Sequence, residues 1–207
     1  MKDPVYEATS KAKRQAESGN PKGAVDTLED YLLTDPHNTK VRMQLAHVHI
    51  YDLKDMETGI MHMDIVLDLE PENVEALKVM VTVLAKHKKY NKETSELYER
   101  LLAASPDADL YNAYAIFLRI QMTDFERSGE YYEKAIALKP KKPEYHQNYA
   151  VLLLNDLKDY VKAKEELETL LRLEPENQSA KKNYDLLVKK KFDSNGNLKK
   201  RSPFSRK

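Results

Sequence analysis

The chain has 207 residues, of which 41% are hydrophobic and 33% are charged, and it contains no cysteine and no tryptophan. The missing cysteines exclude disulfide bonds and thiolate chemistry. No apolar run approaches the roughly 20 residues that a membrane-spanning helix needs. The first residues also lack the apolar stretch of a secretory signal, so the sequence predicts a cytoplasmic protein without a membrane span.

The formal net charge of zero hides an uneven distribution. Residues 189–207 carry eight basic residues and one acid, which gives this segment a charge of +7 and leaves −7 on the remaining 188 residues. From residue 192 onward the chain has high charge and few large apolar residues. This composition predicts an acidic body followed by a basic, disordered tail at 192–207.

The strongest pattern is an internal repeat. Prolines recur at spacings of 35, 35, 34 and 35 residues, at Pro36, Pro71, Pro106, Pro140 and Pro175. The segment LEPEN at 69–73 returns at 173–177, a displacement of three periods. Self-similarity at a fixed period of this length indicates stacked supersecondary units.

Each period has the pattern of two helices. In the fifth, Tyr145, Tyr149 and Leu152 form an apolar stripe at helical spacing, and Leu167 and Leu170 do the same in the following segment. The joint between the two segments is short enough to require an antiparallel helix pair. No alternating strand pattern of useful length is present, so we predict an all-α protein.

A small residue lies twelve positions before each proline, and a large one follows four positions later. The small residues are Ala24, Gly59, Thr94, Ser128 and Ala163. With the closing proline, these features resemble the tetratricopeptide repeat (TPR) family, although the tryptophan usual in its first helix is absent. The resemblance implies a right-handed α-α superhelix, a TPR solenoid of about five helix-pair repeats with a C-terminal capping helix.

On this basis we expect the solenoid to extend over residues 1–191 and the tail over 192–207. The expected repeats are 5–38, 39–73, 74–108, 109–142 and 143–177, followed by the capping helix 178–191.

The residues of a catalytic centre are not apparent. The five glycines form no phosphate-binding motif, and no nucleophile, base and orienting group fall on a common face. A His47–His62 pair is the conceivable metal site, but it lacks a third clear ligand. We therefore predict no enzymatic activity, no metal and no cofactor.

The resemblance implies that partner-binding residues lie on the concave face of the first helices. In the fourth repeat this helix is apolar nearly all round, which predicts an exposed cluster of Tyr114 and Phe117. Burial of these rings against the next repeat is the open alternative. The predicted partner-binding residues are Met43, His47, Tyr51, Val79, Tyr114, Phe117, Gln121, Gln147 and Asn148.

The sequence therefore predicts a scaffold that binds a protein or peptide segment in the concave groove. The alternative is that the basic tail binds nucleic acid or an anionic surface. A further hypothesis is that the tail docks on the acidic body, with Leu198 or Phe204 in the groove. RNA binding by the body is disfavoured because its charge of −7 repels phosphates. The residues that some relatives use to grip a chaperone carboxylate are absent.

Overall fold

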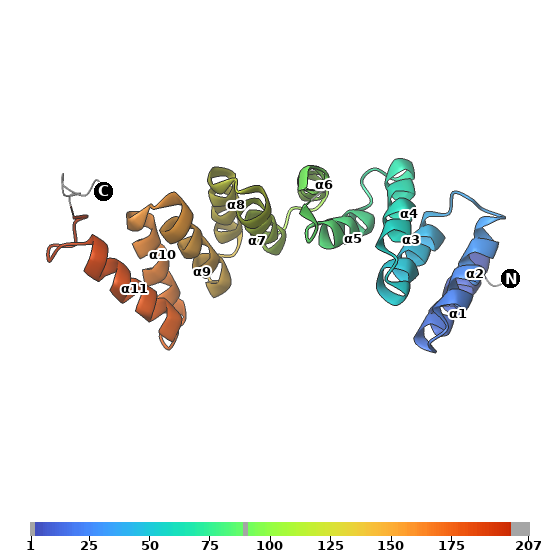
Figure 1. The fold of residues 1–207 in the computed structure, drawn as a ribbon, viewed down its shortest axis with the longest axis horizontal. Helices are drawn as coiled ribbons and strands as arrows, with labels where there is room; N and C mark the ends of the chain where they lie inside the picture. The colour runs from blue at the N-terminus through green and yellow to red at the C-terminus, as the bar shows by residue number, and fades with distance from the viewer. Residues whose placement is uncertain (1–2, 89–90, 200–207) are drawn as a thin grey trace. The chain divides into compact units, whose positions relative to one another are not determined.

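The computed structural model describes residues 3–88 and 91–199 (Figure 1). The chain divides into two compact units, Met1–Ser105 and Pro106–Lys207. In the described ranges both units consist of helices and turns, apart from one isolated β-bridge between Phe192 and Leu198. None of the helices in those ranges is long and apolar enough to cross a membrane.

The described part of the first unit contains three helix pairs. Its elements are α1 (Pro4–Glu17), α2 (Pro21–Leu32), α3 (Thr39–His47), the π-helical turn η1 (Val48–Leu53), α4 (Met56–Leu69), α5 (Val74–Leu84) and α6 (Asn91–Ala104). Helix α1 packs on α2, α3 on α4, and α5 on α6, and each pair also contacts the next.

The described part of the second unit contains two helix pairs and a last single helix. Its elements are α7 (Ala108–Phe117), the π-helical turn η3 (Leu118–Met122), α8 (Phe125–Leu138), α9 (Pro143–Leu152), the π-helical turn η4 (Leu153–Leu157), α10 (Tyr160–Leu173) and α11 (Gln178–Lys191). Helix α7 packs on α8 and α9 on α10, while α11 covers α10. The predicted all-α solenoid of five helix pairs with a capping helix is thereby confirmed.

The repeated turn after each second helix determines where the next first helix begins. The side chains of Asn38, Asn73 and Asn177 accept hydrogen bonds from backbone N–H groups three residues later, at 2.9–3.1 Å. These asparagines satisfy one of the unpaired donors at each helix start, which is the role of an N-cap residue. The asparagine of each PEN or PHN segment is therefore the N-cap residue of the helix that follows it.

The same turn explains why one period is 34 residues and the others are 35. In the 35-residue period that begins at Pro36, the N-cap residue Asn38 follows the proline by two positions. In the 34-residue period, Asp107 caps α7 one position after Pro106. The variable residue thus lies between the proline and the next helix, outside the packed helical segments.

Three of the first helices end in a π-helical turn followed by a residue with left-handed backbone. These residues are Lys54, Thr123 and Lys158, with φ of 59°, 53° and 58°. An aspartate that caps the next helix follows each of them. The left-handed residue reverses the chain, and it is unfavourable for a side chain with a Cβ atom.

We expect Thr123→Gly to raise the free energy of unfolding of the second unit by about 1 kcal/mol, because threonine is branched at Cβ and strained at positive φ. Lys54→Gly should stabilise less, since lysine is unbranched at Cβ. Each substitution also removes one exposed hydrogen bond to a carbonyl oxygen, from Lys54 Nζ to Tyr51 and from Thr123 Oγ1 to Met122, both at 2.7 Å. Chemical denaturation of the full chain measures both changes. Thr123→Ala retains the Cβ atom and is the matched control; equal stabilisation by alanine and glycine would contradict the strain argument.

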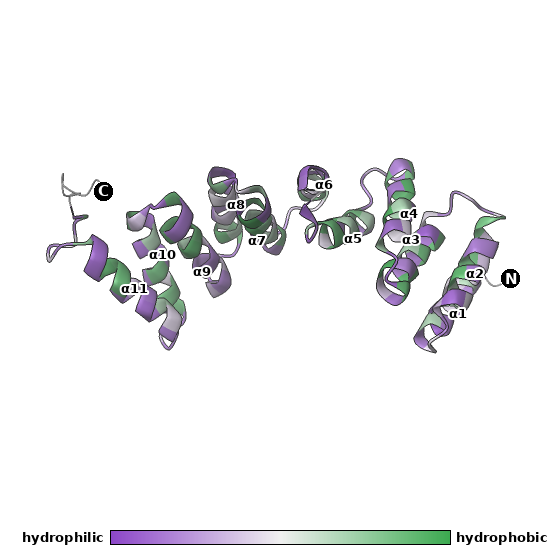
Figure 2. Ribbon diagram, viewed as in Figure 1, coloured by the Kyte–Doolittle hydropathy of each residue, from purple (hydrophilic) through white to green (hydrophobic). Residues whose placement is uncertain are grey.

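The predicted column of small residues lies where paired helices cross closely. A Cβ atom on Gly59 would lie 2.3 Å from Ile50 Cγ1, so a larger residue would force a shift. At the equivalent place in the second unit, the Ser128 hydroxyl donates to the Ala115 carbonyl at 2.8 Å. Figure 2 shows hydrophobic residues beside hydrophilic ones along the helices of both units, as expected for helices with one packed face.

Candidate partner-binding site

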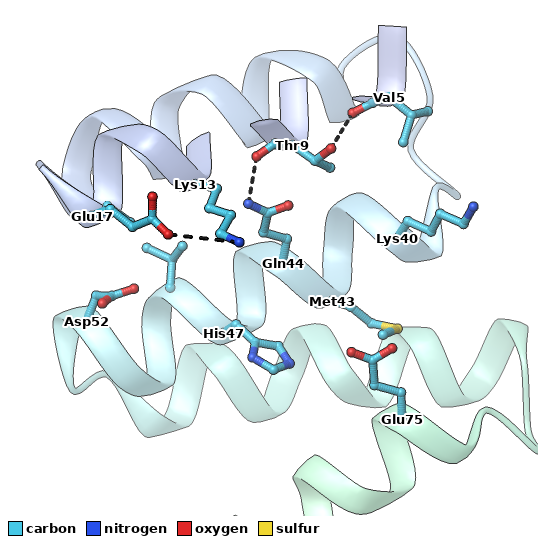
Figure 3. A pocket seen from close by; sticks show the side chains of 12 residues that line it. Val5, Thr9, Lys13, Glu17, Lys40, Met43, Gln44, His47, Asp52 and Glu75 are labelled. Carbon is cyan, nitrogen blue, oxygen red and sulfur yellow. Dashed lines mark hydrogen bonds and ion pairs between the residues drawn. The ribbon is translucent and has the colours of Figure 1, made fainter. Parts of the chain in front are cut away.

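A pocket of about 730 Å³ lies in the first unit, on the side formed by its successive first helices (Figure 3). The lining residues come from α1 (Val5, Thr9, Lys13, Ala16, Glu17), from α3 and η1 (Lys40, Met43, Gln44, His47, Val48, Asp52) and from α5 (Glu75). First helices of consecutive repeats therefore line one groove in this unit.

A polar contact holds two walls of the pocket together. The Gln44 amide of α3 donates to the Thr9 carbonyl oxygen of α1 at 2.8 Å, as drawn in Figure 3. The Thr9 hydroxyl donates to the Val5 carbonyl at 2.7 Å within α1. Because its amide N–H group already has a partner, Gln44 stabilises the groove and offers less to a ligand than its neighbours do.

The three predicted residues of the second repeat lie together at this groove. Met43 and His47 are half-buried and line the pocket. Tyr51 is 45% exposed, and its ring centroid lies 5.4 Å from that of His47. Met43 and His47 thus face the pocket, whereas Tyr51 lies next to His47 and outside the lining.

The charged residues of the pocket have mixed signs. Lys13 and Lys40 are basic, whereas Glu17, Asp52 and Glu75 are acidic. The Lys13 ammonium lies 3.9 Å from the Glu17 carboxylate, and both side chains are largely exposed, so this ion pair contributes little stability. The pocket can therefore pair with charges of either sign on a ligand.

Helix α1 contributes pocket residues that the sequence prediction omitted, among them Val5, Thr9 and Lys13. The signal was present in the sequence, since the first repeat begins at residue 5. Extending the groove positions of the second repeat back by one period would have included this helix.

Three predicted residues are buried. The exposed fractions of Val79, Tyr114 and Phe117 are 8%, 0% and 4%. The prediction that Tyr114 and Phe117 form an exposed cluster is therefore wrong as regards their exposure. Both rings are buried, but among the described residues the ring and hydrogen-bond contacts that Tyr114 receives from another helix come from α8 of the same repeat and not from the next repeat.

Local contacts explain the burial of Tyr114. Its ring lies edge-on to Tyr131 at 4.6 Å between centroids and stacks with Phe117 at 6.3 Å. Its hydroxyl oxygen accepts a hydrogen bond from the Arg127 guanidinium at 2.9 Å. Helix α7 packs against α8, which brings Tyr131 and Arg127 over the ring. The nearly all-round apolar character of α7 reflects this packing.

The three predicted amides of the second unit differ in accessibility. Gln121 and Asn148 are half-buried, whereas Gln147 is exposed. The Asn148 amide donates to the Asn112 side-chain oxygen at 3.1 Å, which links α9 to α7. That contact uses part of the hydrogen-bonding capacity of Asn148 inside the unit.

Comparisons with known proteins agree with this architecture. A model of the tetratricopeptide repeat family matches residues 108–142. The chain therefore contains a tetratricopeptide repeat at 108–142, and its fold is that of solved tetratricopeptide repeat structures. No curated protein sequence matches it.

Solved structures extend the similarity to most of the length of this chain. A structure of MamA (41-end) from Desulfovibrio magneticus RS-1 is 24% identical, with a TM-score of 0.68 over 86% of this chain and 99% of that one. A tetratricopeptide repeat protein from Parabacteroides merdae ATCC 43184 is 14% identical, with a TM-score of 0.70 over 89% of this chain and 72% of that one. Proteins of this family generally act as non-enzymatic scaffolds that bind other proteins.

The histidine geometry of this chain differs from the pair considered in the sequence. His49, rather than His47, lies next to His62, with 5.8 Å between ring centroids. The His49 Nδ1 atom lies 3.3 Å from an Asp55 carboxylate oxygen. Within residues 3–88 and 91–199, no three His, Asp or Glu side chains are placed to hold a metal ion together.

The first residues of the predicted basic tail form a closed turn after α11. The Asp193 carboxylate accepts hydrogen bonds from the N–H groups of Asn195 and Asn197, each at 2.9 Å. Phe192 is buried, and the Lys164 ammonium lies over its ring at 5.3 Å from the centroid. The tail hypothesis that involves Phe204 concerns residues 200–207, which lie outside the described residues.

Proposed function

We propose that this protein is a non-enzymatic scaffold that binds a segment of a partner protein in the pocket lined by α1, α3 and α5. The observation that supports this function is the 730 Å³ pocket itself, which successive first helices line and into which the half-buried Met43 and His47 side chains project. A volume in this range accommodates one or two side chains of a bound segment.

The lining suggests the chemistry of such a segment. An apolar side chain would contact Met43, Val5 and Val48, which form the hydrophobic part of the pocket. Charged side chains beside it would pair with Lys40 or Glu75 at the rim. Helix-in-groove and extended-peptide recognition both use one apolar anchor flanked by polar contacts.

We expect the double substitution Met43→Glu/His47→Glu to weaken partner binding roughly tenfold or more, because it places two acidic groups where an apolar anchor would be buried. The measurement is affinity capture from the native cell by the tagged full chain, followed by titration of the captured partner with purified protein. A photo-cross-linking residue at position 43 would identify the contacting segment.

The control is Leu33→Glu, because Leu33 follows α2, is 82% exposed and lies outside the pocket lining. This variant should bind as the wild type does. If the double variant keeps its helical circular dichroism and also keeps full affinity, the pocket is not the partner site.

A further inference from the structure

The first unit has a second groove, of about 320 Å³, between helices α4 and α6. These are second helices of adjacent repeats, so this groove has different walls from the pocket between α1, α3 and α5. Helix α5 contributes to both: Glu75 lines the first pocket, while Met80 and Leu84 line the second groove. Positions 75 and 84 are nine residues apart and therefore lie on opposite sides of a helix.

The floor of the second groove is apolar. Met80 and Leu84 are 3% exposed, and Leu97 of α6 is 7% exposed. Ile60 of α4, which is half-buried, extends this apolar surface up one wall. One hydrophobic side chain from a ligand would meet mainly these apolar side chains at the bottom of the groove.

The rim of this groove is acidic. Asp64 of α4 and Glu93 and Glu96 of α6 are exposed, and none of the three forms an ion pair with any residue that the structure describes. Among the described lining residues Arg100 alone is basic, and its guanidinium donates to the Pro71 carbonyl oxygen at 2.6 Å. The rim therefore carries three carboxylates and one cation already engaged by the backbone.

The electrostatic surroundings of Asp64 support this description. Although the Asp64 side chain reaches solvent, partial desolvation by its neighbours raises the pKa of its carboxyl group, and the nearby Asp68 carboxylate raises it further. A cation placed beside Asp64 would relieve both effects, because an opposite charge stabilises the ionised carboxylate.

We propose that the groove between α4 and α6 is a second protein-interaction surface, and that it binds a basic partner segment with an apolar side chain at its centre. The rim carboxylates would form ion pairs with Lys or Arg side chains of the partner, and the apolar floor would contact its central apolar side chain. The same carboxylates repel nucleic acid and anionic lipid. This surface is separate from the pocket of the proposed function, so either can be wrong without the other.

The test uses a fluorescein-labelled synthetic peptide with the sequence of residues 198–207, LKKRSPFSRK. The full chain in every titration carries Leu198→Ala and Phe204→Ala, so that its own copy of this segment lacks the apolar anchors. The peptide contains five basic residues and two large apolar ones, the composition that the groove should bind. Anisotropy titration should give an affinity about tenfold weaker for Asp64→Asn/Glu93→Gln/Glu96→Gln than for the reference chain without this triple substitution. High salt should weaken binding to the reference chain as well, because the rim is exposed.

The matched control removes the same number of exposed carboxylates from helix α2, as Asp26→Asn/Glu29→Gln/Asp30→Asn, at positions that line neither groove. Its affinity for the peptide should stay within about twofold of the reference chain, whereas equal weakening by both triple variants would mean non-specific charge attraction and would overturn the proposal. A peptide with alanine in place of Leu198 and Phe204 should bind more weakly, and unchanged binding of that peptide would also overturn it.

A second measurement avoids dependence on the triple variant's folding. Amide chemical shifts of the reference chain, followed during addition of the peptide, should change along α4 and α6. Changes confined to α1 and α3 would instead place the peptide in the first pocket and overturn the proposed site.

Discussion

Replacing His146 with alanine should lower the free energy of unfolding of the second unit by about 3 kcal/mol at pH 6. His146 is 4% exposed, and both of its ring nitrogens have acceptors. Nδ1 lies 2.6 Å from a Glu166 carboxylate oxygen, and Nε2 lies 2.8 Å from the Pro140 carbonyl oxygen. Both nitrogens can donate only in the protonated ring, so the site holds an imidazolium that joins α9, α10 and the preceding turn.

The pH dependence of this contribution follows from the same contacts. The Glu166 hydrogen bond, followed by the bond to Pro140, raises the pKa of His146 above 6.5 in the folded protein, although burial opposes the shift. A raised folded-state pKa means that the stabilisation is fully present below pH 6.5 and is lost as the pH rises through the folded value. The stability difference between wild type and variant should therefore narrow from pH 6 to pH 9.

Hydrogen–deuterium exchange of the α9 and α10 amides measures this effect locally, without assuming that the two units unfold together. His37→Ala is the control, since His37 is exposed. If the difference in stability between the wild type and His146→Ala stays constant from pH 6 to pH 9, the ring contributes by packing alone.

The free energy of unfolding of the first unit should decrease in acid, because His62 is buried in its neutral form. Its ring is 8% exposed, and neither its Nδ1 atom nor Nε2 of the adjacent His49 has a hydrogen-bond partner among the described residues. Burial, followed by the nearby His49 and Arg42, lowers the pKa of His62 to about 4. The folded unit therefore keeps this imidazole neutral at a pH where the unfolded chain would protonate it.

A lowered histidine pKa makes the unfolded state bind the proton first, so stability falls as the pH drops from 6.5 towards 4 and then levels off. The full difference between a pKa of 6.5 and one of about 4 corresponds to about 3 kcal/mol, and structural relaxation around the charged ring reduces the expected loss to about 2 kcal/mol. His62→Leu should remove this part of the acid sensitivity, because leucine fills the site without a titrating group.

Denaturant titrations between pH 7 and pH 4, followed by exchange of the α3 and α4 amides, would measure the change. The control His37→Gln changes an exposed residue, so its free energy of unfolding should fall with decreasing pH as steeply as that of the wild type. If His62→Leu loses as much stability in acid as the wild type does, the carboxylates of the unit rather than this ring control its acid response.

The repeat architecture could be predicted because its signals are local and recur. Each of the five recurring prolines follows the end of a helix, Asn or Asp caps begin most of the next ones, and apolar residues at helical spacing mark the packed face. The small residue at Gly59 or Ser128 marks a close crossing wherever it occurs in the period. Five repeats of the same signals leave little ambiguity about the fold class.

The candidate site was only partly predictable. Met43 and His47 were found because groove positions recur with the repeat, and the pocket does include them. The exposure of Tyr114 could not be derived in the same way, because an apolar side chain on a nearly all-apolar helix can face either a groove or a neighbour. The position of Tyr131 and Arg127 on α8 decided that question.

By itself, the sequence determined the all-α fold of five helix pairs with a capping helix and its resemblance to tetratricopeptide repeats, since these depend on signals within one period. Only the tertiary structure decided which nitrogen of which histidine is paired, because His49 meets His62 and His146 meets Glu166 across helix interfaces. It also revealed the groove between α4 and α6, whose walls come from different repeats. Burial and electrostatics at such places depend on side chains far apart in the chain, and no local pattern encodes them.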